Sequence, residues 1–187
     1  MARNKPQAIQ YRRKREKKTD YKKRLHLLTS RRPRVVIRLT NTRLIAQLVQ
    51  FQPAGDLVLV GVQSTSLRKF GWQYSCKNFP AAYLTGLLFA KKSVAAGFKE
   101  AILDTGLLTP LRKGKVYAFL RGVLDGGLQV PVGSDEIFPT EDMVQGKHVA
   151  VLGSKAKGNQ FTQYLKTGVK PEGITAQFEK VKAQLQS

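Results

Sequence analysis

The sequence contains few residues that form covalent cross-links or hold metal ions. Among its 187 residues there is one cysteine, Cys76, and there are two histidines, His26 and His148, which lie far apart along the chain. A single cysteine cannot form an intramolecular disulfide, and a structural zinc site needs about four ligands. We therefore expect Cys76 to be a reduced, partly buried thiol, and we expect no metal ion or other cofactor.

The sequence also lacks a long hydrophobic run. The longest mostly apolar stretch, FPAAYLTGLLFA at 79–90, has 12 residues and includes proline and glycine, whereas a helix that crosses a bilayer needs about 20. The first ten residues, MARNKPQAIQ, lack the apolar core of a signal peptide. We therefore expect a cytoplasmic protein that makes no contact with a membrane.

Acidic residues are scarce relative to basic ones. The chain has 33 lysines and arginines against 12 aspartates and glutamates, which gives a formal net charge of +21. Residues 1–34 alone hold 14 basic and two acidic residues. A charge block of this density favours a polyanionic partner, because neutralised phosphates release their condensed counterions.

The middle of the chain is typical of a mixed α/β domain. Segments at 33–40, 41–51 and 56–64 are rich in β-branched residues and predict an antiparallel three-stranded meander. In the first, Val35, Ile37 and Leu39 alternate with Arg34, Arg38 and Thr40, so one face points to a core. The third segment is apolar on both faces, and we expect both faces of the sheet to be covered.

Two helices and two further strands follow. We expect a buried helix at 80–97 between Asn78 and Gly97, a short strand within 98–106, a helix at 114–127 and a last strand at 128–132. The order is β-β-β-α-β-α-β, which predicts an α/β fold with a mixed sheet, similar in order to the ribonuclease H type.

The two ends of the chain are expected to pack on this core. Residues 11–29 are helix-capable, and Tyr21, Leu25 and Leu28 form an apolar stripe that should dock on the body. Near the other end, a helix should place four apolar side chains on one face: Ile174, Phe178, Val181 and Leu185. We divide the chain into a basic arm and helix at 1–32, a core at 33–133 and a C-terminal extension packed on the core at 134–187.

The acidic residues do not have the pattern of a nuclease. A nuclease of the ribonuclease H type needs several carboxylates that converge on two metal ions. The first predicted strand supplies none, Asp56 lies in a hairpin turn, and Asp104 and Asp125 lie at element ends, where acids commonly cap or pair. No phosphate-binding glycine loop and no nucleophile motif occur in the sequence. We therefore expect a binding protein and not an enzyme.

Cations interleaved with aromatic residues favour RNA as the partner. Such surfaces place cations on phosphates and aromatic rings on unpaired bases. Tyr11 and Tyr21 flank the basic run, and the segment 67–78, which we expect to be a loop, holds a second group: Arg68, Lys69, Phe70, Trp72, Tyr74 and Lys77. Phe70 and Trp72 either stack on bases or pack at the edge of the sheet. No motif typical of DNA-binding proteins is present, which favours RNA over DNA.

Three long segments resemble one protein family. They are NFPAAYLTGLLFAKKS, AILDTGLLTPLRKGKVYAFLRGVLDGGLQVPV and IFPTEDMVQGKHVA, and they are similar to archaeal members of a family of large-subunit ribosomal proteins that bind 5S rRNA (number eighteen in the universal scheme, five in eukaryotes). The resemblance covers nearly the whole chain. It implies a ribonuclease H-like fold without catalysis, located in the central protuberance. It also implies 5S rRNA, 23S rRNA and neighbouring ribosomal proteins, including the other 5S-binding protein, as partners.

The resemblance also implies which residues contact RNA, because the family holds RNA with its N-terminal basic segment and the adjacent sheet surface. In this sequence these residues are Arg3, Lys5, Arg12, Arg13, Lys14, Arg15, Lys17, Lys18, Lys22, Lys23, Arg24, Arg31, Arg32 and Arg34. From composition and strand alternation we add Tyr11, Tyr21, Arg38, Asn41, Arg68, Lys69, Trp72 and Tyr74. A non-selective RNA chaperone is the alternative function, and selectivity for 5S rRNA over an RNA of equal size separates the two.

Overall fold

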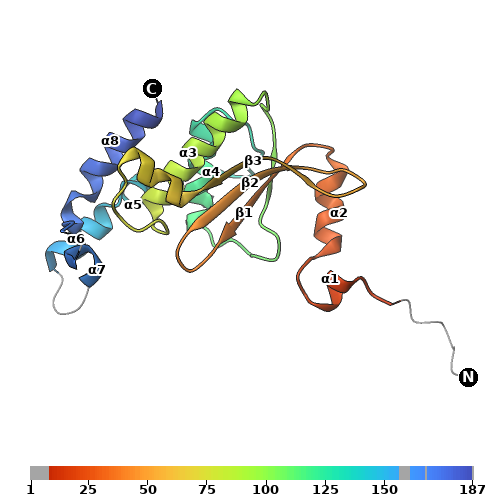
Figure 1. Cartoon of the computed structure of the whole chain (residues 1–187), viewed down its shortest axis with the longest axis horizontal. Coiled ribbons are helices and arrows are strands. Elements are labelled where there is room, and N and C mark those ends of the chain that lie inside the picture. Colours follow the sequence, from red (N-terminus) through yellow and green to blue (C-terminus); the bar gives the residue numbers. More distant parts are fainter. Residues whose placement is uncertain (1–8, 156–160, 167, 187) are drawn as a thin grey trace, which may run out of the picture.

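The computed structural model describes residues 9–155, 161–166 and 168–186. These residues form a four-stranded sheet, a helical layer, and shorter helices toward the two ends of the chain (Figure 1). In chain order the elements are α1 (Arg12–Arg15), α2 (Tyr21–Thr29), β1 (Arg34–Leu39), β2 (Leu44–Gln50), β3 (Leu57–Gln63), η1 (Ser64–Phe70), α3 (Phe79–Ala95), β4 (Ile102–Asp104), α4 (Lys115–Asp125), η2 (Asp135–Ile137), α5 (Glu141–Gln145), α6 (Lys147–Lys155), α7 (Thr162–Lys166), η3 (Pro171–Gly173) and α8 (Ile174–Gln186).

The sheet has the strand order β3-β2-β1-β4. The first three strands form the predicted antiparallel meander, in which Val35 lies opposite Leu48, and Leu48 lies opposite Val60. β4 pairs in parallel with the other side of β1, with Leu103 opposite Val35. The predicted α/β class with a mixed sheet is confirmed.

The last predicted strand, at 128–132, does not form. Gln129 makes only an isolated parallel bridge with Glu100, in which the Ala101 N–H donates to the Gln129 carbonyl at 3.0 Å and the Gln129 N–H donates to the Lys99 carbonyl at 2.9 Å. Two residues further on, Pro131 has no N–H, so it cannot extend a ladder. The core order is therefore β-β-β-α-β-α.

One face of the sheet is covered and the other is largely open. Val35 and Ile37 of β1 are buried, and they belong to one core cluster with residues of β2, α3 and α4. On the opposite face Arg38 is exposed, and Val58 of β3 keeps 48% of its surface exposed. The expectation that both faces are covered is wrong, since apolar side chains on an edge strand can remain at the surface.

Helices α3 and α4 cross with their backbones in contact. A Cβ atom on Gly86 would lie 2.1 Å from the Phe119 carbonyl oxygen, and one on Gly122 would lie 2.1 Å from the Tyr83 carbonyl oxygen. Only glycine fits at either position, and the close approach lets the Phe89 and Phe119 rings pack with their centroids 5.8 Å apart. Asn78 caps α3 as predicted, because its side chain accepts a hydrogen bond from the Ala81 N–H at 2.9 Å.

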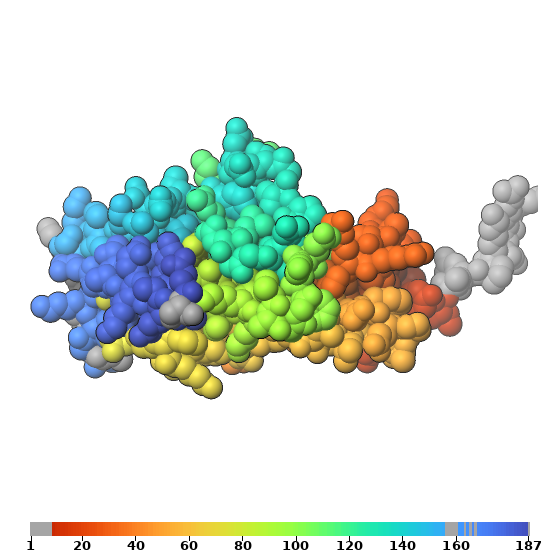
Figure 2. All heavy atoms as spheres, turned by 90° about the horizontal axis from the view of Figure 1, so that it is seen from above, coloured from red at the N-terminus to blue at the C-terminus, as the bar shows by residue number. Residues whose placement is uncertain are grey.

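The C-terminal helix packs as predicted. α8 buries the four expected residues Ile174, Phe178, Val181 and Leu185, and the Phe178 ring lies 5.6 Å from the Tyr83 ring of α3. Seen from above, the C-terminal segment lies at the opposite end of the molecule from α2 (Figure 2). The core therefore lies between two ends of the molecule: one carries α2, which has no fully buried residue, and the other carries α8, which buries four apolar side chains.

The predicted helix at 11–29 is split in two. α1 ends at Arg15, Lys17 adopts a left-handed φ of 51°, and α2 begins only at Tyr21. All four residues of α1 are cationic and repel one another, while the Asp20 side chain accepts the Lys23 N–H at 3.1 Å and starts a new helix. The expected loop at 67–78 also differs, because its first four residues end the 3₁₀ helix η1.

The helix crossing gives a first prediction. Gly86→Ala should lower the free energy of unfolding by about 3 kcal/mol, because the new methyl group forces the two backbones apart. Gly61→Ala, in β3, is the control, since a Cβ there would meet no atom within 4 Å, and it should change stability by less than about 0.5 kcal/mol. Urea denaturation of both variants measures the difference, and a Gly86→Ala variant as stable as the control would contradict the close approach.

Candidate nucleic-acid interface

Helix α2 is fastened to the body by charged and polar contacts. The Lys23 ammonium donates to the Thr105 hydroxyl and to the Gly106 carbonyl, both at 2.9 Å. The Arg24 guanidinium forms a two-pronged ion pair with the Asp56 carboxylate, at 2.8 and 2.7 Å. These contacts tie the helix to the loop after β4 and to the turn before β3.

The apolar stripe expected to dock α2 is covered only in part. Leu25 keeps 67% of its surface exposed, and no residue of α2 is buried. Lys23 and Arg24 occupy the side of the helix that faces the body, so the side chains with the strongest partners decide its orientation. The predicted docking is therefore wrong for Leu25, whereas Tyr21 and Leu28 are half-buried.

Arg34 lies at the centre of a buried charge network and not on the RNA-facing surface. Its side chain is 4% exposed, and its two terminal nitrogens lie 2.6 Å from Asp104 and 2.7 Å from Asp56. Asp104 in turn accepts the Gly106 N–H at 2.8 Å. The predicted RNA contact by Arg34 is corrected, because both of its terminal nitrogens are committed to carboxylates.

The network shifts the titration of its shared carboxylate. The hydrogen bond from Arg24 holds the pKa of Asp56 below its ordinary value, and the hydrogen bond from Arg34 acts in the same direction against partial burial. The same contact with Asp56 raises the pKa of Arg24. Asp56 is thus a stable anion that joins two guanidinium groups.

The aromatic residues of the 67–78 segment are placed in the core. Trp72 is 1% exposed and donates its indole N–H to the Ser75 carbonyl at 3.2 Å. Tyr74 is buried beside it, with ring centroids 5.5 Å apart, and donates its hydroxyl to the Lys170 carbonyl at 2.6 Å. The prediction that Trp72 and Tyr74 stack on RNA is therefore wrong, because both side chains pack in the core. Arg68 and Lys69 remain exposed, but on η1, which contacts α8 far from α2 (Figure 1).

The remaining predicted cations lie around α1 and α2 and on the open face of the sheet. Two of them contact Glu16, Arg12 at 3.9 Å and Lys18 at 2.9 Å, and Arg32 pairs with Glu100 at 3.4 Å. Asn41 is exposed in the turn between β1 and β2, and Arg3 and Lys5 lie outside the described residues. Of the predicted RNA-contacting cations in this region, those that are exposed and have no ion pair within the described residues are Arg13, Lys14, Arg15, Lys17, Lys22, Arg31 and Arg38.

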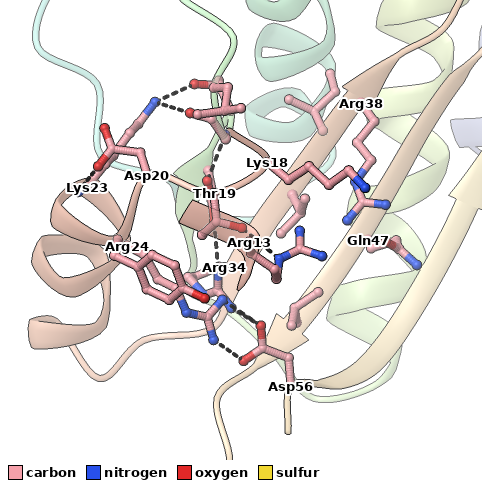
Figure 3. A pocket seen from close by; sticks show the side chains of 18 of the residues that line it. Arg13, Lys18, Thr19, Asp20, Lys23, Arg24, Arg34, Arg38, Gln47 and Asp56 are labelled. Carbon is pink, nitrogen blue, oxygen red and sulfur yellow. Dashed lines mark hydrogen bonds and ion pairs between the residues drawn. The ribbon is translucent and has the colours of Figure 1, made fainter. Parts of the chain in front are cut away.

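A pocket of about 740 Å³ lies between α2, the segment before it and the open face of the sheet. Its wall includes Arg13, Lys18 and Tyr21, and its other side includes Val36, Arg38 and Gln47 from β1 and β2. The close-up shows Lys18 and Arg38 extending toward one another beside Gln47 (Figure 3). Sequence reasoning missed Gln47 and Asp56, because a glutamine within a strand and an aspartate in a turn carry no distinctive pattern.

The three acidic residues weighed as nuclease candidates are used for pairing within the chain. Asp56 and Asp104 are both bound to Arg34, and Asp125 accepts the Tyr83 hydroxyl at 2.7 Å. Among the described residues no group of three histidine, cysteine or acidic side chains is placed to hold a metal ion. The described helices include none with the length and apolar character needed to cross a bilayer.

Comparison with known proteins identifies the family. A model described as ribosomal large subunit proteins 60S L5 and 50S L18 matches residues 5–99. The chain is also 46% identical over 186 residues to the large ribosomal subunit protein uL18 of Korarchaeum cryptofilum (strain OPF8), an alignment that covers 97% of this chain and 95% of that protein. The chain belongs to this L5/L18 family.

Membership of the L5/L18 family confirms the resemblance found in the sequence and gives the chain a structural role in the large ribosomal subunit. The matched residues 5–99 include α1, α2 and the three antiparallel strands. All the residues that line the pocket, except the short stretch Asp104–Leu107, lie within that match. The pocket and its cations therefore belong to the part of the chain that the family model describes.

The charge network gives a second prediction. Asp56→Asn should lower the free energy of unfolding by about 2–4 kcal/mol, because Arg34 stays buried with one carboxylate in place of two. Asp142→Asn is the matched control, since its ion pair with Lys147 is exposed on both sides, and it should cost less than about 0.5 kcal/mol. Denaturation in urea, which is uncharged, measures both values, and equal losses would contradict a structural role for Asp56.

The pKa of Asp56 gives a third prediction. A carboxyl whose pKa is lowered by folding stabilises the folded state above its unfolded pKa, ordinarily 3.8, and this contribution is lost as the pH falls through the lower folded value. The stability difference between the wild type and Asp56→Asn should thus be constant near neutral pH and shrink below about pH 4. Urea denaturation at a series of pH values checks this, and a difference that grows in acid would contradict it.

Proposed function

We propose that the chain binds 5S rRNA and helps to attach it to 23S rRNA in the central protuberance of the large subunit. The observation that carries the proposal is the separation of the N-terminal cations into two groups. Lys23, Arg24 and Arg34 are committed to contacts within the chain. Of the exposed cations around them, Arg12 and Lys18 share the single carboxylate of Glu16, and most of the others have no ion pair within the described residues. Phosphates of an RNA backbone supply the missing negative charge.

The proposed contact surface has two parts. The first is the basic segment from Arg12 to Lys22, which α2 holds beside the sheet. The second is the open face of β1, where Arg38 is exposed and lines the same pocket as Arg13 and Lys18. Together these residues form a curved cationic surface, which suits an irregular RNA with accessible backbone and unpaired bases.

The proposed protein partners contact the other end of the chain. We propose that Arg68 and Lys69 of η1, together with the exposed side of α8, face neighbouring ribosomal components, including the other 5S-binding protein. η1 and α8 lie at the end away from α2 (Figure 2), so both surfaces are available at once. The arm and helix at 1–32, the core at 33–133 and the extension at 134–187 then have distinct roles.

Binding measurements across a range of salt concentrations test the proposal. The wild type should prefer 5S rRNA to a size-matched competitor, and log Kd should rise linearly with log salt. Deletion of residues 1–18 removes eight cations and one glutamate but keeps Asp20, Lys23 and Arg24, so α2 should stay docked. The deletion should weaken binding and reduce the slope by about 0.7–0.9 for each phosphate contact that is lost.

A single charge change on α8 is the control. Lys180→Gln, on the exposed side of α8, should leave both the affinity for 5S rRNA and the salt slope within error of the wild type. Equal binding of 5S rRNA and competitor would instead indicate a non-selective RNA chaperone. An unchanged slope after deletion of residues 1–18 would place the RNA surface elsewhere on the chain.

A further inference from the structure

The pocket beside α2 differs from a simple phosphate-binding surface because it has an apolar floor. Val36, Val49 and Val58 come from β1, β2 and β3 in turn and all line it. Val36 pairs with Gln47 across the first two strands, and Val49 pairs with Val58 across the next two, so these side chains share one face of the sheet. A charged phosphate gains nothing from contact with apolar side chains, whereas the flat face of a base can pack against them.

The size of the pocket selects a small occupant. Its volume of about 740 Å³ lies within the range of about 300–1,000 Å³ that is typical of small-molecule sites. The sheet closes one side and the α1–α2 segment closes the other, so a double helix cannot enter. One nucleotide turned out of a loop or bulge can enter.

The pocket also supplies a ring for stacking. Tyr21 lines the pocket and is half-buried, and its ring is supported by Tyr11 with the two centroids 5.2 Å apart. A ring held in this way is available to a flat partner at little cost in conformational freedom.

One amide is available to hydrogen-bond the edge of a base. Gln47 is half-buried on the pocket floor, and within the described residues its side chain has no hydrogen-bond partner. A primary amide has both a donor and an acceptor, which match the paired donor and acceptor edges of bases. Gln47 lies opposite Val36 and two residues before Val49 on the same face of the sheet, so its amide extends from the valine floor.

The charges around the pocket favour a phosphate at its mouth. The lining includes six cationic side chains against three carboxylates, Asp20, Asp56 and Asp104. Those carboxylates are already used: Asp20 caps α2, and the other two bind Arg24 and Arg34. Arg13 and Arg38 remain without an ion pair in the described residues, and Lys18, whose ammonium pairs with the exposed Glu16 at 2.9 Å, extends toward Arg38 (Figure 3).

We infer that this pocket receives a single unpaired nucleotide of the bound RNA, with its base between Tyr21 and the valine floor, the base edge at Gln47, and its phosphate among Arg13, Lys18 and Arg38. The inference rests on the proposed RNA-binding function and adds to it a site that reads an extruded base. The contact is noncovalent, and no chemical change of the RNA is involved.

Tyr21 variants of the full chain, bound to 5S rRNA, test the inference. Tyr21→Leu removes the flat ring without changing charge and should weaken binding about tenfold at every salt concentration, with an unchanged salt slope. Tyr21→Phe is the matched control, because it keeps the ring and should bind like the wild type. Circular dichroism confirms that each variant is folded.

Chemical probing of the same complexes shows whether a base is involved. Dimethyl sulfate modifies unpaired adenine and cytosine, and a carbodiimide modifies unpaired guanine and uracil. The wild type and Tyr21→Phe should protect one unpaired base that Tyr21→Leu leaves reactive. Gln47→Ala, which shortens an exposed-face side chain and should leave the fold intact, should expose the same base.

The outcomes separate this inference from the proposed function. An identical footprint for Tyr21→Leu and the wild type would overturn the nucleotide pocket. A lower salt slope for Tyr21→Leu than for the wild type would also overturn it, because the pocket would then hold backbone phosphate alone. If the wild type does not distinguish 5S rRNA from the competitor, the proposed function fails. The nucleotide pocket can still be tested on either RNA, because Tyr21→Leu and Tyr21→Phe should differ in affinity and in chemical footprint only if a base occupies it.

Discussion

The pairing of Arg34 with two aspartates organises the end of the molecule that carries the basic segment. Arg34 opens β1, Asp104 ends β4, and Asp56 lies in the turn before β3, so one guanidinium joins three parts of the sheet. A buried arginine loses much hydration free energy, and only well-placed carboxylates offset that loss. Asp56 then reaches beyond the sheet to Arg24 and fixes the position of α2. The placement of α1, of the pocket and of the cations around it follows from this chain of contacts.

The few acidic residues of the chain decide what each cation can do. Where an aspartate or glutamate is within reach, as for Arg24 and Arg34, the arginine is structural. Where none is within reach, as for Arg13 and Arg38, the cation remains unpaired and faces the open sheet. The resulting self-repulsion lowers the stability of the free protein, and RNA phosphates relieve it on binding.

Hydrophobic periodicity was sufficient to predict β1, α4 and α8, because each of them buries a face with a regular spacing. Helix α3 was predicted from its apolar run between Asn78 and Gly97, and residues 80–90 of this helix are all buried. The sequence could not show that Arg34 is buried, since its partner Asp104 is 70 residues away and an arginine in an alternating strand normally faces solvent. Trp72 and Tyr74 were misplaced for a related reason: their polar, aromatic surroundings resemble an RNA-binding loop, yet the two rings pack against each other, and Tyr74 also packs against Tyr164. The pocket was also beyond sequence reasoning, because its lining extends from Arg13 to Leu107 along the chain.

The manner in which α2 is attached has a consequence for the protein before it meets RNA. No residue of this helix is fully buried, and Tyr21, Leu27 and Leu28 are only partly covered, so its release from the body would uncover less apolar surface than the release of a helix with a fully buried face. The undocked form would therefore expose few apolar sites for self-association, whereas a helix docked through an apolar stripe would expose that stripe on release. Release of the basic segment would therefore do little to promote aggregation of the free protein before it is assembled with RNA.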